Sequence, residues 1–167
     1  FDKYYPDPEE EEYFKLYAKE IYQEMLVLNQ VIDFMLSYSK SGLNFEDLNL
    51  NELVSGLFKS YETSLKAENI RSIVEIPDNL RINTNRQFFM DILQNMISNS
   101  VKALKGVPDK TIKCSGYISE NDLILSMSDN GIGIPLEKRE WVFGVFNTTT
   151  AESGGAGIGL YVVKTRV

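Results

Sequence analysis

The amino-acid sequence predicts an α/β protein, a two-layer α/β sandwich preceded by a long helix. Apolar residues recur at spacings of three and four from about residue 9 to residue 39, which is the period of a helix. From residue 51 onward, helical segments alternate with short, mainly antiparallel strand-forming runs, a pattern typical of helices packed on a sheet. With 167 residues, 43% of them hydrophobic, the chain can form one domain with a helical appendage.

Residues 1–42 are interpreted as part of a helical bundle. Two prolines predict an irregular lead-in at residues 1–8, and the helix that follows has an apolar face wider than a single stripe. Such a face requires more than one neighbouring helix. Gly42 ends the helical pattern, and residues 43–50 are interpreted as a linker.

Residues 51–167 are expected to form the second domain. Its predicted elements are a helix at 51–66, strands at 70–76 and 80–83, a helix at 86–105, a hairpin of strands at 111–118 and 123–129, a short helical turn at 136–142 and a helix from about residue 157. Asn85 is the predicted N-cap of the helix at 86–105. The chain begins without methionine and its pattern stops inside the last helix, so we expect a C-terminally incomplete fragment.

Composition narrows the range of functions. The chain has no histidine, which excludes histidine-dependent triads and argues against zinc and haem sites. The single cysteine, Cys114, is interpreted as a small buried strand residue, with a reactive thiol as the alternative. A net charge of −7 without a Lys/Arg cluster argues against nucleic-acid binding. No segment is apolar enough to cross a membrane, so we expect a cytoplasmic fragment without direct membrane contact, whose parent protein can be membrane-anchored elsewhere.

Three motifs carry the candidate chemistry. Asn95, Asn99 and Lys102 share one face of the helix at 86–105, although asparagine is a poor residue for a helix interior. Solvent-facing asparagines are the alternative interpretation. The second motif is an acid followed by alternating glycines, Asp129, Gly131 and Gly133, and the third is a run of alternating glycines, Gly155, Gly157 and Gly159.

The spacing of these glycines fits neither of the two best-known phosphate motifs. The dinucleotide fingerprint requires a glycine five residues after its first, where this chain has Leu136 or Leu160. The P-loop requires Gly-Lys-Ser/Thr, which is absent after Gly159. A glycine-rich loop that leads into a helix N-terminus can still bind phosphate, because free N–H groups and the helix dipole favour anions.

Taken together, the motifs resemble the GHKL superfamily of gyrase, heat-shock chaperone, histidine kinase and mismatch-repair ATPases, and within it the sensor histidine kinases. NMISNSVKAL (95–104) resembles the N box, DNGIGIP (129–135) the first glycine box, VFGVF (142–146) the F box and GGAGIGL (154–160) the second glycine box. The long helix followed by LNLNELV (48–54) resembles the second helix of a dimerisation and phosphoacceptor hairpin that leads into the catalytic domain. The resemblance implies the Bergerat ATP-binding fold.

The resemblance also implies ATP and Mg²⁺ as cofactors and assigns roles to residues. Asp129 would accept a hydrogen bond from the exocyclic amine of adenine, Asn99 would bind Mg²⁺, and Asn95 and Lys102 would be the catalytic pair near the phosphates. The implied nucleotide-binding residues are Asn95, Asn99, Lys102, Asp129, Gly131, Gly133, Ile134, Phe143, Phe146, Thr148, Thr149, Gly155, Gly157, Ile158, Gly159 and Leu160.

The function implied by the resemblance is a protein-histidine kinase. It would transfer the γ-phosphoryl group of ATP to a histidine outside this chain, for relay to the aspartate of a response regulator receiver domain. The parent protein would form a homodimer through the helical hairpin.

Three alternatives remain open: a water-hydrolysing GHKL ATPase, a serine kinase of the anti-sigma type, and a pseudokinase that only binds nucleotide. The hydrolysing members carry a glutamate base where this chain has Asn95, which cannot accept a proton at neutral pH. The anti-sigma kinases should lack the long helix.

Overall fold

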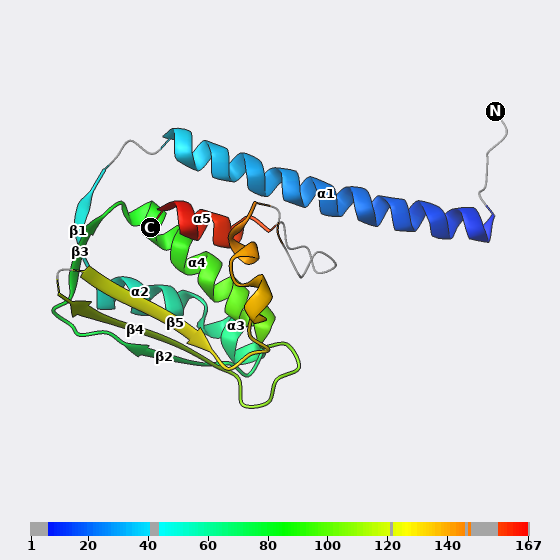
Figure 1. The fold of residues 1–167 in the computed structure, drawn as a ribbon. Coiled ribbons are helices and arrows are strands. Elements are labelled where there is room, and N and C mark those ends of the chain that lie inside the picture. Colours follow the sequence, from blue (N-terminus) through cyan, green and yellow to red (C-terminus); the bar gives the residue numbers. More distant parts are fainter. Residues whose placement is uncertain (1–6, 41–43, 121, 146, 148–156, 167) are drawn as a thin grey trace.

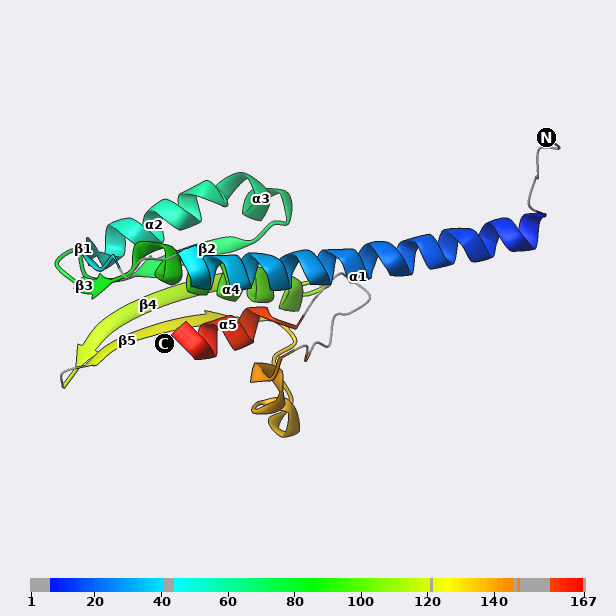
Figure 2. The same ribbon diagram turned by 90° about the horizontal axis from the view of Figure 1, so that it is seen from above.

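The computed structural model describes residues 7–40, 44–120, 122–145, 147 and 157–166. A long helix, α1 (Pro8–Lys40), extends beyond a compact α/β domain, in which helices cover one face of a sheet (Figures 1 and 2). This arrangement confirms the predicted two-layer sandwich preceded by a long helix. Within the described ranges, no helix combines the length and the apolar character needed to span a membrane.

The main sheet has the strand order β2-β4-β5. Strand β2 (Arg71–Glu75) runs parallel to β4 (Thr111–Ser119), and β4 pairs antiparallel with β5 (Asp122–Asp129). Alternate residues of β4 are buried against the helices, beginning with Ile112 and Cys114. The hairpin predicted at 111–118 and 123–129 therefore agrees with the structure to within one residue at each strand.

A second, two-stranded sheet includes a strand from the segment predicted to be a linker. Strand β1 (Glu46–Asn49) pairs antiparallel with β3 (Arg81–Thr84) (Figure 1). Acidic residues and asparagine are poor strand formers, and Leu48 is the buried residue of β1, so the local sequence carried no strand signal. The pairing with β3 forms this strand.

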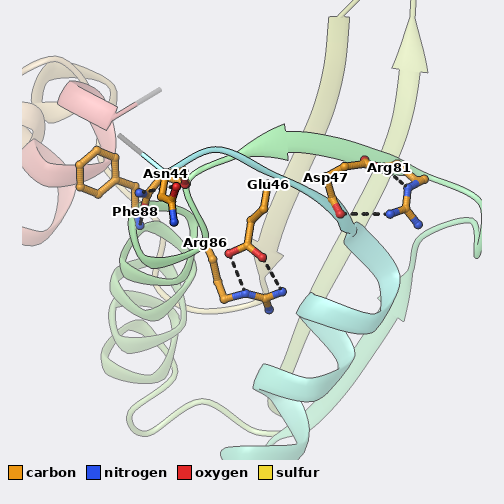
Figure 3. A network of polar contacts seen from close by, with 7 residues as sticks. Asn44, Glu46, Asp47, Arg81, Arg86 and Phe88 are labelled. Carbon is orange, nitrogen blue, oxygen red and sulfur yellow. Dashed lines mark hydrogen bonds and ion pairs between the residues drawn. The ribbon is translucent and has the colours of Figure 1, made fainter. Parts of the chain in front are cut away.

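Polar contacts fix β1 on its neighbours (Figure 3). The Arg81 Nε atom lies 2.8 Å from Asp47 Oδ2, and the Arg86 Nε atom lies 3.1 Å from Glu46 Oε1. The side-chain amide of Asn85 donates to the Asn44 carbonyl oxygen at 3.3 Å. The segment that precedes β1 is therefore attached to the first turn of the helix that begins at Arg86.

The described residues of the α/β domain form the helices α2 (Leu50–Ser60), α3 (Glu62–Ala67), α4 (Arg86–Ala103) and α5 (Gly159–Arg166). The helix predicted at 51–66 is divided in two at Tyr61. The predicted N-cap of α4 is confirmed, because Asn85 Oδ1 accepts a hydrogen bond from the Phe88 N–H at 3.0 Å. Two single 3₁₀ turns, η1 (Leu136–Lys138) and η2 (Trp141–Phe143), stand where a short helical turn was predicted.

The hydrophobic core lies between the helical layer and the main sheet. Its fully buried large side chains are Leu50, Val54, Leu93, Ile97, Leu104, Ile112 and Cys114. The described apolar side chains of α1 lie outside this core. Those that are exposed include Phe14, Tyr17, Ile21, Met25, Leu28, Ile32 and Met35, whereas Val31 packs against Ile158 and Val162.

Cys114 is expected to be chemically inert in the folded protein. Its side chain is fully buried in β4, and burial raises the pKa of its thiol to about 11, so the nucleophilic thiolate is scarce at neutral pH. A maleimide should therefore label the protein only after denaturation, as mass spectrometry would detect. Rapid labelling of the native protein at pH 7.5 would contradict the burial of this side chain.

Candidate functional site

The candidate site is built on one face of α4. The opposite face is fixed in the core by fully buried residues such as Leu93 and Ile97, which turns Asn95, Asn99 and Lys102 toward the partly exposed side. Asn99 and Lys102 are half-buried, and neither side chain has a hydrogen bond or ion pair with another described residue. An amide oxygen and an ammonium group are thus available to a ligand at adjacent turns of the helix.

Asn95 has a different environment, in which it contacts the start of α5. Its side-chain amide donates to the Asp91 carbonyl oxygen, one turn earlier, at 2.8 Å. A Cβ atom at Gly159 would lie 2.7 Å from Asn95 Oδ1, a distance that Cβ contacts do not adopt. A side chain at residue 159 would therefore require the Asn95 amide to shift, and glycine lets α5 begin directly against it.

The second glycine box shapes the entry to α5. Gly157 has a φ of +67°, a backbone conformation that favours glycine. Ile158 is buried beside Val162 and anchors the helix, whose first residue is Gly159 rather than the predicted residue 157. Leu160 is half-buried.

The first glycine box contacts the C-terminal end of α4. A Cβ atom at Gly131 would lie 2.5 Å from the Ala103 carbonyl oxygen, and the Ile132 N–H donates to that same oxygen at 3.1 Å. Gly133 has a φ of +68° and open space where a side chain would be. Gly131 thus has a steric role against α4 that the sequence did not predict.

Asp129 is the last residue of β5, and its side chain is exposed. Its Oδ1 atom accepts a hydrogen bond from the Gly131 N–H at 2.9 Å, which is an Asx turn that fixes the direction of the carboxylate. Its Oδ2 atom has no hydrogen bond to the described residues. One carboxylate oxygen is therefore held by the loop and the other can accept from a ligand.

The structure also places other residues that the sequence assigned to the site. Ile134 lies in the first glycine box and is 48% exposed, and Phe143 is half-buried in η2, which packs against α5. Four assigned residues lie outside the described ranges: Phe146, Thr148, Thr149 and Gly155.

Two contributors were missed by sequence reasoning. The carbonyl oxygen of Ala103 accepts a hydrogen bond from the Ile132 N–H of the first glycine box. No residue type in the sequence marks a backbone acceptor at a helix end. Asn130 bonds the loop that precedes β4 through both ends of its side chain. The sequence signal for Asn130 was its position between a strand-ending acid and a glycine, where asparagine commonly bonds backbone groups.

The motifs converge on α4 in a defined order. The start of α5 contacts α4 at Asn95, and the first glycine loop contacts it at Ala103, about 12 Å further along the helix axis by the rise of 1.5 Å per residue. Asn99 and Lys102 lie between these two contacts. The arrangement places an acid at one end, glycine-rich backbone at the other, and an amide oxygen with a cation between them, which suits an extended, polyanionic ligand such as a nucleoside triphosphate.

The sequence matches a known family over this same region. Residues 84–167 match the family described as histidine kinase-, DNA gyrase B- and HSP90-like ATPases. The chain belongs to this family of ATPase domains. Within the family, it is a catalytic ATP-binding domain of the sensor histidine kinase type, as its relatives and structural neighbours indicate.

The relatives by sequence are sensor kinases. The chain is 30% identical over 156 residues to the signal transduction histidine-protein kinase AtoS of Escherichia coli, covering 92% of this chain and 25% of AtoS. It is 29% identical over 156 residues to the autoinducer 2 sensor kinase/phosphatase LuxQ of Vibrio harveyi, covering 86% of this chain and 18% of LuxQ. The chain thus spans a quarter or less of these two proteins.

The solved structures that it resembles agree with this class. A nucleotide-free form of the catalytic domain of the histidine kinase ThkA has a TM-score of 0.66 and 27% identity, covering 74% of this chain and 79% of that one. The structure of ThkA in complex with the response regulator protein TrrA has a TM-score of 0.64 and 28% identity, covering 88% of this chain and 43% of that one.

Proposed function

We propose that this chain binds Mg-ATP and catalyses transfer of the γ-phosphoryl group to a histidine outside its own sequence. The observation that carries the proposal is the pair of side chains on α4, Asn99 and Lys102, which have no polar partner among the described residues. They lie between the contacts that the two glycine boxes make with this helix. Phosphoryl transfer depends mainly on positioning and on neutralising charge, and this arrangement supplies groups for both.

Each group has a distinct role in this proposal. Asn99 offers its amide oxygen to Mg²⁺, a hard cation that prefers oxygen ligands and keeps substrate phosphates in its shell. Lys102 offers positive charge to the phosphates, and the backbone N–H groups at Gly157 and Gly159 are the proposed hydrogen-bond donors to them. Asp129 accepts from the exocyclic amine of adenine through Oδ2, while Gly131 holds Oδ1.

A kinase is favoured over a water-hydrolysing ATPase by the environment of Asn95. Its amide is already bonded to the Asp91 carbonyl oxygen and packed against Gly159, and an amide cannot take a proton from water at neutral pH. Asn95 therefore acts by holding α5 in place beside the phosphates. The better nucleophile is an imidazole nitrogen supplied from outside this sequence.

The partners proposed for the parent protein follow from α1. Its exposed apolar side chains, such as Phe14, Ile21 and Met25, require neighbouring helices, and a homodimer through a helical hairpin would supply them. A response regulator receiver domain is the proposed recipient of the phosphoryl group, in line with the ThkA–TrrA complex. A cytoplasmic location is proposed for this part of the protein.

The test is transfer in trans. With radiolabelled ATP, this chain alone should remain unlabelled, because it contains no histidine. With a helical hairpin that carries the parent's histidine, the hairpin should become labelled. The product should be labile in acid and stable in base, as a phosphoramidate is. The transfer forms an N–P bond, breaks the bond between the γ-phosphorus and the bridging oxygen, and releases ADP.

Controls distinguish the alternatives. Asn99→Ala should abolish the transfer, because a Mg²⁺ ligand is lost. Acid-stable label on the chain alone would indicate a serine kinase. Rapid phosphate release without an acceptor would indicate a hydrolysing ATPase, and ATP binding without any transfer to the hairpin would indicate a pseudokinase.

A further inference from the structure

The ladder between β4 and β5 stops at the pair Ile112 and Asp129. Beyond it, the Asn130 N–H reaches the Thr111 carbonyl oxygen at a long 3.4 Å, and the chain turns toward the end of α4. A strand that leaves a sheet in this way deprives the neighbouring strand of its backbone partners.

The side chain of Asn130 replaces these partners. Its Oδ1 atom accepts from the Thr111 N–H at 2.8 Å, and its Nδ2 atom donates to the Asp109 carbonyl oxygen at 3.1 Å. The two contacts continue the β4–β5 pairing by side-chain bonds after the backbone has departed. An amide is suited to this, because one group must accept and the other must donate.

These bonds also determine where the following loop goes. Asp109 has a φ of +51°, a left-handed conformation, in the turn that precedes β4. The Asn130 side chain attaches the first glycine box to this turn. The next residue, Gly131, then lies against Ala103 and donates its N–H to Asp129 Oδ1. The direction of the Asp129 carboxylate therefore depends on the position of Gly131, which Asn130 sets.

We propose that Asn130 is a positioning residue for base specificity: through Gly131, it directs the free oxygen of Asp129 toward the exocyclic amine of the adenine base. This inference rests on the proposed nucleotide-binding function. It concerns selectivity between bases rather than phosphoryl transfer, since the Asn130 side chain bonds backbone groups of the protein. Loss of its two bonds should disturb recognition of the amine more than binding of the phosphates.

The test compares the dissociation constants for Mg-ATP and Mg-ITP, which differ on the base by an amine against a carbonyl oxygen. Isothermal calorimetry should give the native chain at least a tenfold preference for ATP. Asn130→Ala should reduce this preference at least threefold, mainly by weakening ATP binding. Asn130→Asp, which keeps the acceptor and loses the donor to Asp109, should reduce it less.

The matched control is Asn49→Ala. Asn49 also accepts one backbone N–H, from Glu52 at 3.1 Å, and donates to one backbone carbonyl, that of Asp78 at 2.8 Å, but it does so at the start of α2. Asn49→Ala should lower the melting temperature about as much as Asn130→Ala does, and it should leave the ratio of the ATP and ITP dissociation constants unchanged. A native ratio in Asn130→Ala would overturn the positioning role alone, as would an equal fall of the ratio in Asn49→Ala. Failure of the native chain to bind Mg-ATP would overturn the proposed function as well.

Discussion

Replacement of Asp129 by asparagine is expected to weaken ATP binding more than tenfold. The structure gives the reason, because the Gly131 N–H already occupies one carboxylate oxygen. An asparagine has a single oxygen, so it would either release the loop or turn its own NH₂ group toward the amine of the base. Loss of a hydrogen bond to a charged group costs about 1.5–3 kcal/mol, which corresponds to more than tenfold in affinity.

Calorimetric titration with Mg-ATP would measure this effect. Asp122→Asn is the matched control, since Asp122 is an exposed acid at the opposite end of the same strand. The control should bind ATP like the native chain. Equal affinity of Asp129→Asn and the native chain for ATP would contradict the assignment of the base pocket, and so would equal affinity of the native chain for ATP and GTP.

A pair of glycine-to-alanine substitutions should have opposite effects on stability. Gly131→Ala would place a Cβ atom 2.5 Å from the Ala103 carbonyl oxygen, a backbone atom that cannot turn aside. The glycine loop would have to move away from α4 and lose the Ile132 hydrogen bond. Overpacking of this kind costs about 1–3 kcal/mol, and the same displacement should lower ATP affinity at least tenfold because it moves Asp129.

Gly56→Ala is the matched control. Gly56 lies in the interior of α2, is exposed, and has no atom within 4 Å of the position of an added Cβ. Alanine there should stabilise the fold by about 1 kcal/mol, because glycine is the weaker helix former, and should leave ATP affinity unchanged. Thermal melting would show the opposite shifts. If Gly131→Ala, like Gly56→Ala, has a higher melting temperature than the native chain, the contact between the first glycine box and α4 is wrong.

The sequence predicted most of the fold because the relevant signals are local. The period of the apolar residues marked the helices, and Asn85 marked the start of α4 by its capping chemistry. Strand β1 was missed because its stability comes from pairing with β3, about 35 residues further along the chain, rather than from strand-forming residues.

The sequence predicted which residues belong to the candidate site, but it did not predict the contacts between them. The helical period placed Asn95, Asn99 and Lys102 on one face without any knowledge of the fold. That Gly159 contacts Asn95 and Gly131 contacts Ala103 depends on how distant segments pack, which a single sequence does not encode locally. Asn130 was overlooked for the same reason, since its partners precede it by about 20 residues.

The attachment of β1 should depend on salt only in part. The arginine pairs with Glu46 and Asp47 are largely exposed to solvent, so each contributes about 0–1 kcal/mol and is screened by salt. The short ladder with β3 is the firmer part of this attachment. Raising the ionic strength should therefore weaken the two arginine pairs and leave the backbone ladder between β1 and β3 in place.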